Sequence, residues 1–331
     1  MVSSNDFQKA VELIGKSDKI LITTHTKPDG DACGSVTAIC EVLTSIGKTV
    51  KPLLLSELPE WYAFLFAEKP AIFGEDISVK ELKANNFDLI ILVDVDSENQ
   101  LDKFAEYLKR NDAPVLVIDH HITGDGLGDV ELVDTSAAAS GLIVFDLMKY
   151  AGWAMTSDIA RSLFVAISTD TGWFRFTNTD GKVLRCAAEL IDGGVNPSQI
   201  CHQLYQNFSA QRFKLMTKML NTLQLHFDGK YAEQHLLQCD FKETAATSRD
   251  TENLIDECRR IRTVEAAALF VELPDGRIKC SLRSRGQVDV RLIAQKFGGG
   301  GHTMAAGVHL DGPLEKAKKL ILAEVKNRLE K

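Results

Sequence analysis

One stretch, Lys19-Ile-Leu-Ile-Thr-Thr24-His25-Thr-Lys-Pro-Asp29-Gly-Asp31, joins a short apolar run to a turn rich in acidic side chains. Similar apolar runs occur at 49–55, 89–93 and 115–118, and helix-like stretches such as 34–46 lie between them. Continuously apolar strands that alternate with helices are typical of a parallel sheet with both faces covered. The sequence therefore predicts a doubly wound, mostly parallel α/β domain.

The pattern of the chain changes near residue 195. The segment Asp192-Gly-Gly-Val-Asn-Pro197 interrupts the helical periodicity, as glycine and proline commonly do. Later, short apolar runs alternate with turn signals such as Asp228-Gly229, which favours β-hairpins. A chain of 331 residues also exceeds the size at which one hydrophobic core usually stops growing. We therefore expect a first domain at 1–195, a helical linker at 196–221 and a smaller α+β domain at 222–331.

The composition is that of a folded globular protein, with 45% hydrophobic and 25% charged residues. Seven scattered cysteines without a C-x-x-C pair argue against a disulfide framework and against a zinc ribbon. The N-terminal residues lack a basic stretch followed by an apolar run, and no apolar segment reaches the length of a membrane span. We therefore expect a cytoplasmic protein with no membrane partner.

The formal net charge of −8 is spread unevenly along the chain. Residues 222–331 carry 18 Lys and Arg against 16 Asp and Glu, so the acidic surplus lies in 1–221. Such a surface repels a phosphorylated substrate unless local cations offset it. Bound metal ions or the more basic second domain are the candidate sources of that attraction.

Acidic and histidine side chains follow three of the predicted strands. In an open parallel sheet, ligands bind outside the carboxyl ends of the strands, so these side chains should face one crevice. Each cluster alone could be a capping turn, but their convergence favours a metal site. The clusters are His25, Asp29 and Asp31; Asp94 and Asp96; Asp119, His120 and His121; and, after a further apolar run, Asp170.

The predicted ligands are mainly carboxylates, with few imidazoles and no thiolate pair. Such a set favours Mn²⁺ or Mg²⁺ over a thiolate-rich zinc site, although Cys33 lies nearby in the sequence. We expect two divalent ions, Mn²⁺ before Mg²⁺ or Co²⁺. Two such ions about 3.5–4 Å apart stabilise both the entering and the leaving oxygen of a phosphoryl transfer.

The order and spacing of these clusters resemble the four motifs of the DHH phosphoesterase family. The resemblance implies that Asp119 orients a ligand histidine and that His121 faces the substrate phosphate, both at the catalytic centre. Asp96 stays an alternative to Asp94, because the two would share one face of a continuing strand. The metal ligands that the resemblance implies are His25 and Asp29 for one ion, Asp31, His120 and Asp170 for the other, and Asp94 as the bridge.

The C-terminal part resembles the DHH-associated domain of the same family. The segments that carry this resemblance are Lys279–Gly286 and Phe297–Gly307, the second with four consecutive glycines. Glycines allow a backbone to approach an anion closely and leave its N–H groups free, although a glycine run by itself is more often a connector. The implied substrate-binding residues are Arg283, Ser284, Gly299, Gly300, Gly301 and His302.

Within this family, the length and domain order resemble the nano-RNase and pAp phosphatase type. This implies hydrolysis of short RNA or DNA oligonucleotides to mononucleotides, and removal of the 3′-phosphate from 3′-phosphoadenosine 5′-phosphate (pAp). Three alternatives stay open: a phosphodiesterase for linear dinucleotides, a pyrophosphatase or exopolyphosphatase, and a non-catalytic nucleotide-binding protein. The sequence leaves the oligomeric state open, a homodimer included.

Overall fold

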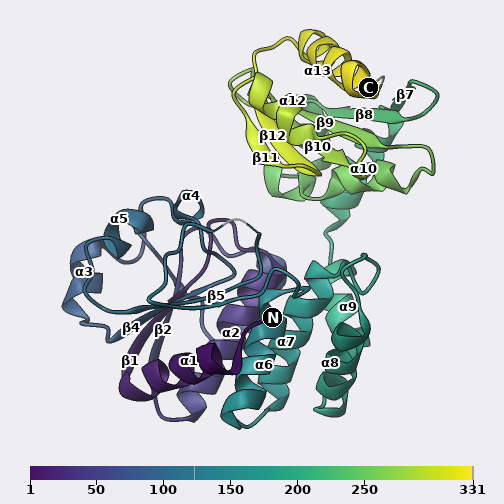
Figure 1. Ribbon diagram of the computed structural model, residues 1–331. Coiled ribbons are helices and arrows are strands. Elements are labelled where there is room, and N and C mark those ends of the chain that lie inside the picture. The colour runs from purple at the N-terminus through teal and green to yellow at the C-terminus, as the bar shows by residue number, and fades with distance from the viewer. Residues whose placement is uncertain (123, 330–331) are drawn as a thin grey trace. The chain divides into compact units, whose positions relative to one another are not determined.

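The computed structural model describes residues 1–122 and 124–329, and of His302 it describes the backbone only. Two compact units, Met1–Asn207 and Phe208–Lys331, make up the chain, and Figure 1 shows the elements of each. Their boundary falls within 196–221, the stretch that we expected to be a linker. Helix α9 (Pro197–Tyr205) belongs to the first unit and α10 (Ala210–Asn221) to the second.

The first unit is built on a six-stranded sheet with the order β3-β2-β1-β4-β5-β6. Every neighbouring pair is parallel, which confirms the predicted fold class. The short strands β3 and β6 were not predicted. The strands are β1 (Lys19–Thr23), β2 (Thr49–Leu54), β3 (Ala71–Ile72), β4 (Leu89–Val93), β5 (Val115–Asp119) and β6 (Val130–Val133).

Helices cover both faces of this sheet, so its central strands are apolar throughout. In β4, Leu89, Ile91 and Val93 join one core cluster, whereas Ile90 and Leu92 join another. Figure 1 shows the two helical layers on opposite sides of the strands. One layer contains α1 (Ser4–Lys16), α2 (Gly30–Ser45), α6 (Ser140–Ala151), α7 (Ser157–Asp170) and α8 (Gly181–Asp192), and the other contains α3 (Val79–Ala84), α4 (Glu98–Leu101) and α5 (Phe104–Leu108).

Helix α2 begins earlier than the sequence pattern predicts, at Gly30 instead of Gly34. The reason is a cap: the Asp29 carboxylate accepts hydrogen bonds from the backbone N–H groups of Asp31 and Ala32, at 3.0 and 3.1 Å. Helix α7 runs to Asp170, so this acid lies in the last helical turn. The start of α2 and the end of α7 therefore carry three of the predicted ligands.

The second unit is a mixed six-stranded sheet with the order β11-β12-β10-β9-β8-β7. The antiparallel pair β7–β8 confirms the hairpin expected at Asp228-Gly229, β9–β10 is a second antiparallel pair, and β8 and β9 are parallel. Between β8 and β9 lie two short 3₁₀ helices, Ser248–Thr251 and Leu254–Arg260. The strands are β7 (Gln224–His226), β8 (Tyr231–Leu236), β9 (Ala266–Glu272), β10 (Ile278–Ser284), β11 (Gly300–His302) and β12 (Ala305–Leu310).

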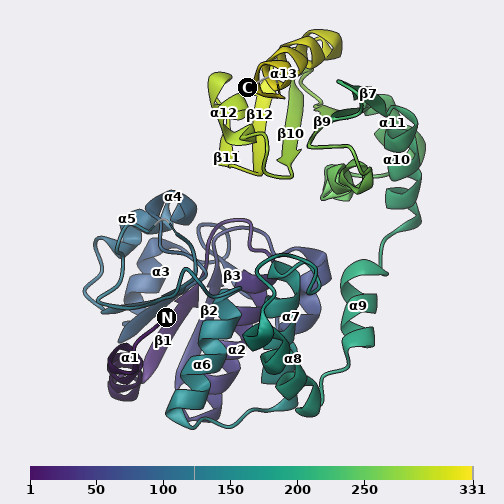
Figure 2. The same ribbon diagram turned by 45° about the vertical axis from the view of Figure 1, so that its right-hand side comes forward.

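This second sheet is also covered on both faces. Helices α12 (Val290–Lys296) and α13 (Leu314–Leu329) pack on one face, and α10 packs on the other with α11 (Gln238–Thr244), as Figure 2 shows. Each unit thus has its own hydrophobic core. Among the described residues, no helix is long and apolar enough to cross a membrane.

Candidate metal centre

The predicted ligands lie at the carboxyl edge of the first sheet. His25 follows β1, Asp94 follows β4 directly, and Asp119, the last residue of β5, leads into His120. Strands β1 and β4 are neighbours in the sheet, and the strand order reverses between them. Such a reversal leaves an open crevice at the strand ends, where ligands of α/β proteins bind.

His120 stands among three carboxylates. Its Nε2 lies 3.7 Å from Asp31 Oδ2, 3.6 Å from Asp94 Oδ1 and 3.7 Å from Asp170 Oδ2. On the other side of the ring, Nδ1 lies 3.2 Å from the carbonyl oxygen of Ala137. Because a carbonyl only accepts hydrogen bonds, Nδ1 carries a hydrogen, and Nε2 is the ring nitrogen that faces the carboxylates.

His25 forms a second group with Asp29 and Asp94, whose ligand atoms all lie within 4.8 Å of one another. Its Nε2 is 3.5 Å from Asp94 Oδ2, and its Nδ1 is 2.9 Å from the carbonyl oxygen of Thr26. Asp94 therefore turns Oδ2 toward His25 and Oδ1 toward His120. Asp31, His120 and Asp170 make up a further group within the same limit, so Asp94 lies between two possible ion sites.

Asp96 lies outside these groups. Its Oδ1 accepts a hydrogen bond from the backbone N–H of Leu127 at 3.0 Å. Asp94 has a left-handed φ of 61°, so the chain leaves the extended conformation there and the two acids do not share one strand face. The geometry favours Asp94 over Asp96 as the shared acid.

His121 is held by Asp119, a carboxylate that is fully buried. His121 Nδ1 lies 2.7 Å from Asp119 Oδ1, and this hydrogen bond raises the pKa of His121. Its Nδ1 is also 3.8 Å from Asp94 Oδ1, and Asp94, His120 and His121 make up a third group of possible ligand atoms within the same 4.8 Å limit. The arrangement suits a cationic imidazole that contacts a phosphate.

The carboxylates repel one another at close range. Burial raises the pKa of Asp94 well above its ordinary value, and Asp31, Asp29 and Asp170 raise it further. Burial, followed by Asp31 and Asp29, raises the pKa of Asp170 to about 8. Divalent cations would relieve this repulsion, and the oxygen and imidazole donors fit them. Burial also raises the pKa of the Cys33 thiol well above its ordinary value, so Cys33 is a poor ligand.

The sequence reasoning missed the residues that hold these carboxylates. Ser35 Oγ donates to Asp31 Oδ1 at 2.9 Å, and Ser140 Oγ donates to Asp94 Oδ1 at the same distance. The backbone N–H groups of Ser140 and Gly141 donate to Asp31 at 2.6 and 2.9 Å. A serine and a glycine at a helix start are common, so the sequence holds no signal that separates this pair from an ordinary cap.

The predicted substrate residues of the second unit differ in their surroundings. Arg283 on β10 is partly exposed, and its Nε lies 3.9 Å from Asp256 Oδ1. Ser284 is fully buried, and its hydroxyl accepts hydrogen bonds from the N–H groups of Gly286 and Val288. Ser284 thus stabilises the turn that follows it. The neighbouring Arg285 donates to backbone carbonyls within the unit.

At two positions of the glycine run, the backbone of a neighbouring strand leaves no room for a side chain. A Cβ on Gly299 would lie 2.3 Å from the carbonyl oxygen of Gly307, and one on Gly301, whose φ is +136°, would lie 2.4 Å from that of Ala305. Gly300 is exposed and has open space around it. The side chain of His302 lies outside what the structure describes.

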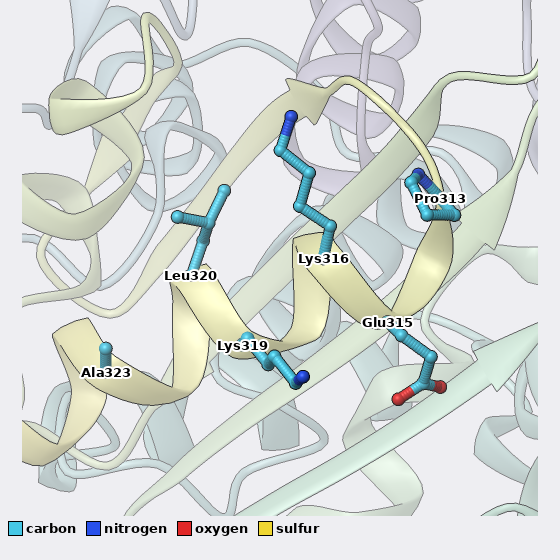
Figure 3. A pocket seen from close by; sticks show the side chains of 6 residues that line it. All are labelled: Pro313, Glu315, Lys316, Lys319, Leu320 and Ala323. Atoms are coloured by element: carbon cyan, nitrogen blue, oxygen red, sulfur yellow. The ribbon is translucent and has the colours of Figure 1, made fainter.

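A pocket lies beside α13, and the residues that line it are separate in the sequence from the predicted site residues. Figure 3 shows Lys316 and Leu320 projecting from one side of this helix. None of its lining residues was predicted as a site, and a hollow on a single exposed helix offers few converging polar groups. The residues that line it are Pro313, Glu315, Lys316, Lys319, Leu320 and Ala323.

The fold and the side chains at its strand ends define a hydrolase of phosphate esters, and the chain belongs to the DHH family. Residues 19–167 match the DHH family, N-terminal domain, and residues 230–331 match the DHHA1 domain. The chain is 34% identical over 317 residues to the bifunctional oligoribonuclease and PAP phosphatase NrnA of Thermus thermophilus, covering 94% of this chain and 90% of the relative. The expected family and enzyme class are confirmed.

Solved structures share the fold. An exopolyphosphatase-related protein from Bacteroides fragilis has a TM-score of 0.94 at 23% identity, covering 100% of this chain and 99% of the other. Exonuclease RecJ bound to manganese has a TM-score of 0.57 at 18% identity, covering 98% of this chain and 94% of the other. At these identities the likeness concerns the fold.

Proposed function

We propose that the protein hydrolyses short RNA or DNA oligonucleotides to mononucleotides and removes the 3′-phosphate of pAp. The observation that carries the proposal is the position of Asp94, whose two carboxylate oxygens face His25 and His120 in separate groups of ligands. The relative from Thermus thermophilus, which bears both activities in its name, supports this choice of substrates.

In the proposed site, the carboxylate of Asp94 would help to hold both of two divalent ions. When bound, the ions would stabilise the negative charge of the phosphoryl oxygens in the transition state. His25 and Asp29 would hold one ion. Asp31, His120 and Asp170 would hold the other, and the carbonyl of Ala137 accepts from Nδ1–H of His120 and so orients that ring.

His121 and Asp119 have a different role in this proposal. Asp119 accepts from Nδ1–H of His121 and so leaves Nε2–H of the cationic ring free to contact a phosphate oxygen. The hydrogen bond to Asp119 raises the pKa of the His121 ring, which favours its protonated form. His121 can then supply a proton to the leaving oxygen.

Mn²⁺ is the proposed ion. Imidazole nitrogens among the carboxylates suit Mn²⁺ better than Mg²⁺, which prefers oxygen ligands and keeps its waters. Exonuclease RecJ, a protein with the same fold, was solved with manganese bound, which agrees with this choice.

In the second unit, Arg283 and the backbone of Gly299, Gly300 and Gly301 are the proposed contacts to the nucleotide. A guanidinium forms strong hydrogen bonds with phosphate oxygens, and Gly300 is exposed on the short strand β11. His302 stays in the proposal through the family resemblance alone. Ser284 would act indirectly, through the turn that follows Arg283.

The test is a panel of substrates incubated with purified protein and Mn²⁺: pAp, dinucleotides, a 24-mer and pyrophosphate. We expect AMP from pAp, mononucleotides from the dinucleotides, and slow turnover of the 24-mer. The same reactions with excess EDTA are the control. Turnover of pyrophosphate with no product from pAp or dinucleotides would contradict the proposal.

A further inference from the structure

The segment 137–141, which runs from the loop after β6 into the first turn of α6, contacts the candidate metal centre at several points. It contributes backbone carbonyls, backbone N–H groups and one hydroxyl. The carbonyl of Ala138 and that of Asp170 both accept from Nδ2 of Asn178, at 3.2 Å each. Directly or through Asn178, the segment therefore reaches Asp31, Asp94, His120 and Asp170.

Helix α6 begins within this segment, and its first N–H groups are used by the site. The N-cap residue Ala139 has no side chain that could accept from them. Instead, the carboxylate of Asp31 accepts from Ser140 N and Gly141 N. Asp31 thereby caps a helix distant in the sequence, and both of its oxygens are fixed.

Ser140 adds a contact of another kind, since its hydroxyl reaches the shared acid. Ser140 is fully buried, and its Oγ donates to Asp94 Oδ1 at 2.9 Å. A carboxylate rotates about its last side-chain bond unless its oxygens are distinguished by their partners. The hydrogen bond from the Ser140 hydroxyl holds Oδ1 of Asp94 in place, so Oδ2 remains turned toward His25.

We infer that Ser140 is a positioning residue that divides the carboxylate of Asp94 between the two metal sites. This inference rests on the proposed function, because it presupposes two ions. The start of α6 does not depend on the hydroxyl, since the N-cap is Ala139 and the bonds to Asp31 come from backbone groups. The hydroxyl is therefore available to donate its hydrogen bond to Asp94.

The test compares Ser140→Ala with the wild-type protein and with Ser162→Ala. Ser162 is also fully buried, but its hydroxyl has no hydrogen-bond partner among the described residues, so it is a matched control. Mn²⁺ binding is measured by calorimetry, and the exchange-coupled manganese pair is measured by EPR. Kinetics with pAp give KM and kcat, and thermal unfolding in EDTA checks the fold.

We expect two Mn²⁺ per wild-type and Ser162→Ala chain. Ser140→Ala should unfold at nearly the wild-type temperature but bind one Mn²⁺ about 10-fold more weakly, because residues that orient metal ligands typically contribute this much. Its coupled EPR signal and kcat should fall, with KM little changed. Wild-type affinity and an unchanged EPR signal in Ser140→Ala would overturn the inference and leave the proposed function intact. A wild-type protein that binds no Mn²⁺ would overturn both.

Discussion

Asp94 is the residue on which the chemistry of the site depends. It follows a fully buried strand, adopts a left-handed backbone conformation with φ 61°, and is itself buried. Asp and Asn tolerate this conformation better than most residues with a Cβ. The turn directs one carboxylate between two groups of ligands, and burial makes that position unfavourable without bound cations.

Replacing Asp94 with Asn keeps the shape of the side chain and removes its charge. We expect kcat on pAp to fall about 100-fold or more, since each 1.36 kcal/mol lost from transition-state stabilisation is tenfold in rate. In EDTA the variant should be more stable than wild type, because burial and nearby carboxylates disfavour the charged Asp94. Thermal unfolding with and without Mn²⁺ measures this, and a lower Tm in EDTA would contradict the electrostatic account.

The stability of the metal-free protein should depend on pH through Asp170. Its pKa is about 8 in the fold, against an ordinary value of 3.8, so the folded state binds this proton more tightly. The contribution of Asp170 to the free energy of unfolding therefore falls as the pH rises from about 4 to 8. Urea unfolding in EDTA at several pH values measures the slope, and Asp170→Asn should flatten it. A slope that Asp170→Asn leaves unchanged would contradict this assignment.

At the scale of residues, residue types and their positions after apolar runs were enough to name acids and histidines that the structure brings together, and their role as metal ligands stays a prediction. The sequence could not choose between Asp94 and Asp96, because the left-handed turn that separates them leaves no signal in an Asp-Val-Asp spacing. Ser140 was missed for a related reason. Its partner, Asp94, is distant in the chain, and only the packing of α6 brings the two together.

At the scale of elements, the packing of α2 on α7 brings Asp31 close to Asp170. A Cβ on Gly34 would lie 2.4 Å from the carbonyl oxygen of Ser162, and one on Gly30 would lie 2.3 Å from the Thr169 side chain. Glycine at these positions lets the helices approach closely. The ligands at the start of α2 and the end of α7 depend on this short distance.

Gly34→Ala should push α2 away from α7. We expect a loss of about 1–3 kcal/mol in the free energy of unfolding, as for other overpacked cores, and weaker Mn²⁺ binding. Gly15→Ala in α1 is the control: it has open space around it and should stabilise the helix by about 0.5–1 kcal/mol. Denaturant unfolding and calorimetry measure both effects. Wild-type stability and Mn²⁺ affinity in Gly34→Ala would contradict the role given to this contact.

The long apolar strands could be predicted at this scale because both of their faces are buried. Strand β3 has two residues and β6 has four, which is too short for a clear pattern. The start of α2 was misplaced because a capping turn and a metal site were treated as alternatives for the cluster that contains Asp29, whereas the structure shows Asp29 as the local cap of the helix.

At the scale of the whole molecule, the two units differ in composition and in the roles proposed for them. The acidic surplus lies in residues 1–221, which hold all the proposed metal ligands. The second unit carries the arginine and the glycine strand proposed for the nucleotide. The change of pattern between the units could be predicted from the sequence. The parallel pairing of β8 and β9 could be seen only in the structure.

Arg283→Ala separates substrate binding from metal binding. We expect KM for pAp to rise about 10-fold or more, the cost of a lost hydrogen bond to a charged group, with Mn²⁺ affinity unchanged. Arg277→Ala is the control, because Arg277 pairs with Asp275 in the exposed turn between β9 and β10. Steady-state kinetics and calorimetry distinguish the two effects. An unchanged KM would remove Arg283 from the proposed substrate contacts.

The central claim is that two divalent ions share the carboxylate of Asp94. Anomalous diffraction from crystals grown with Mn²⁺ tests it most directly. The account predicts two anomalous peaks about 3.5–4 Å apart, one beside His25 and Asp29 and one beside Asp31, His120 and Asp170, with an oxygen of Asp94 on each. A single peak, or two peaks that Asp94 does not join, would contradict it.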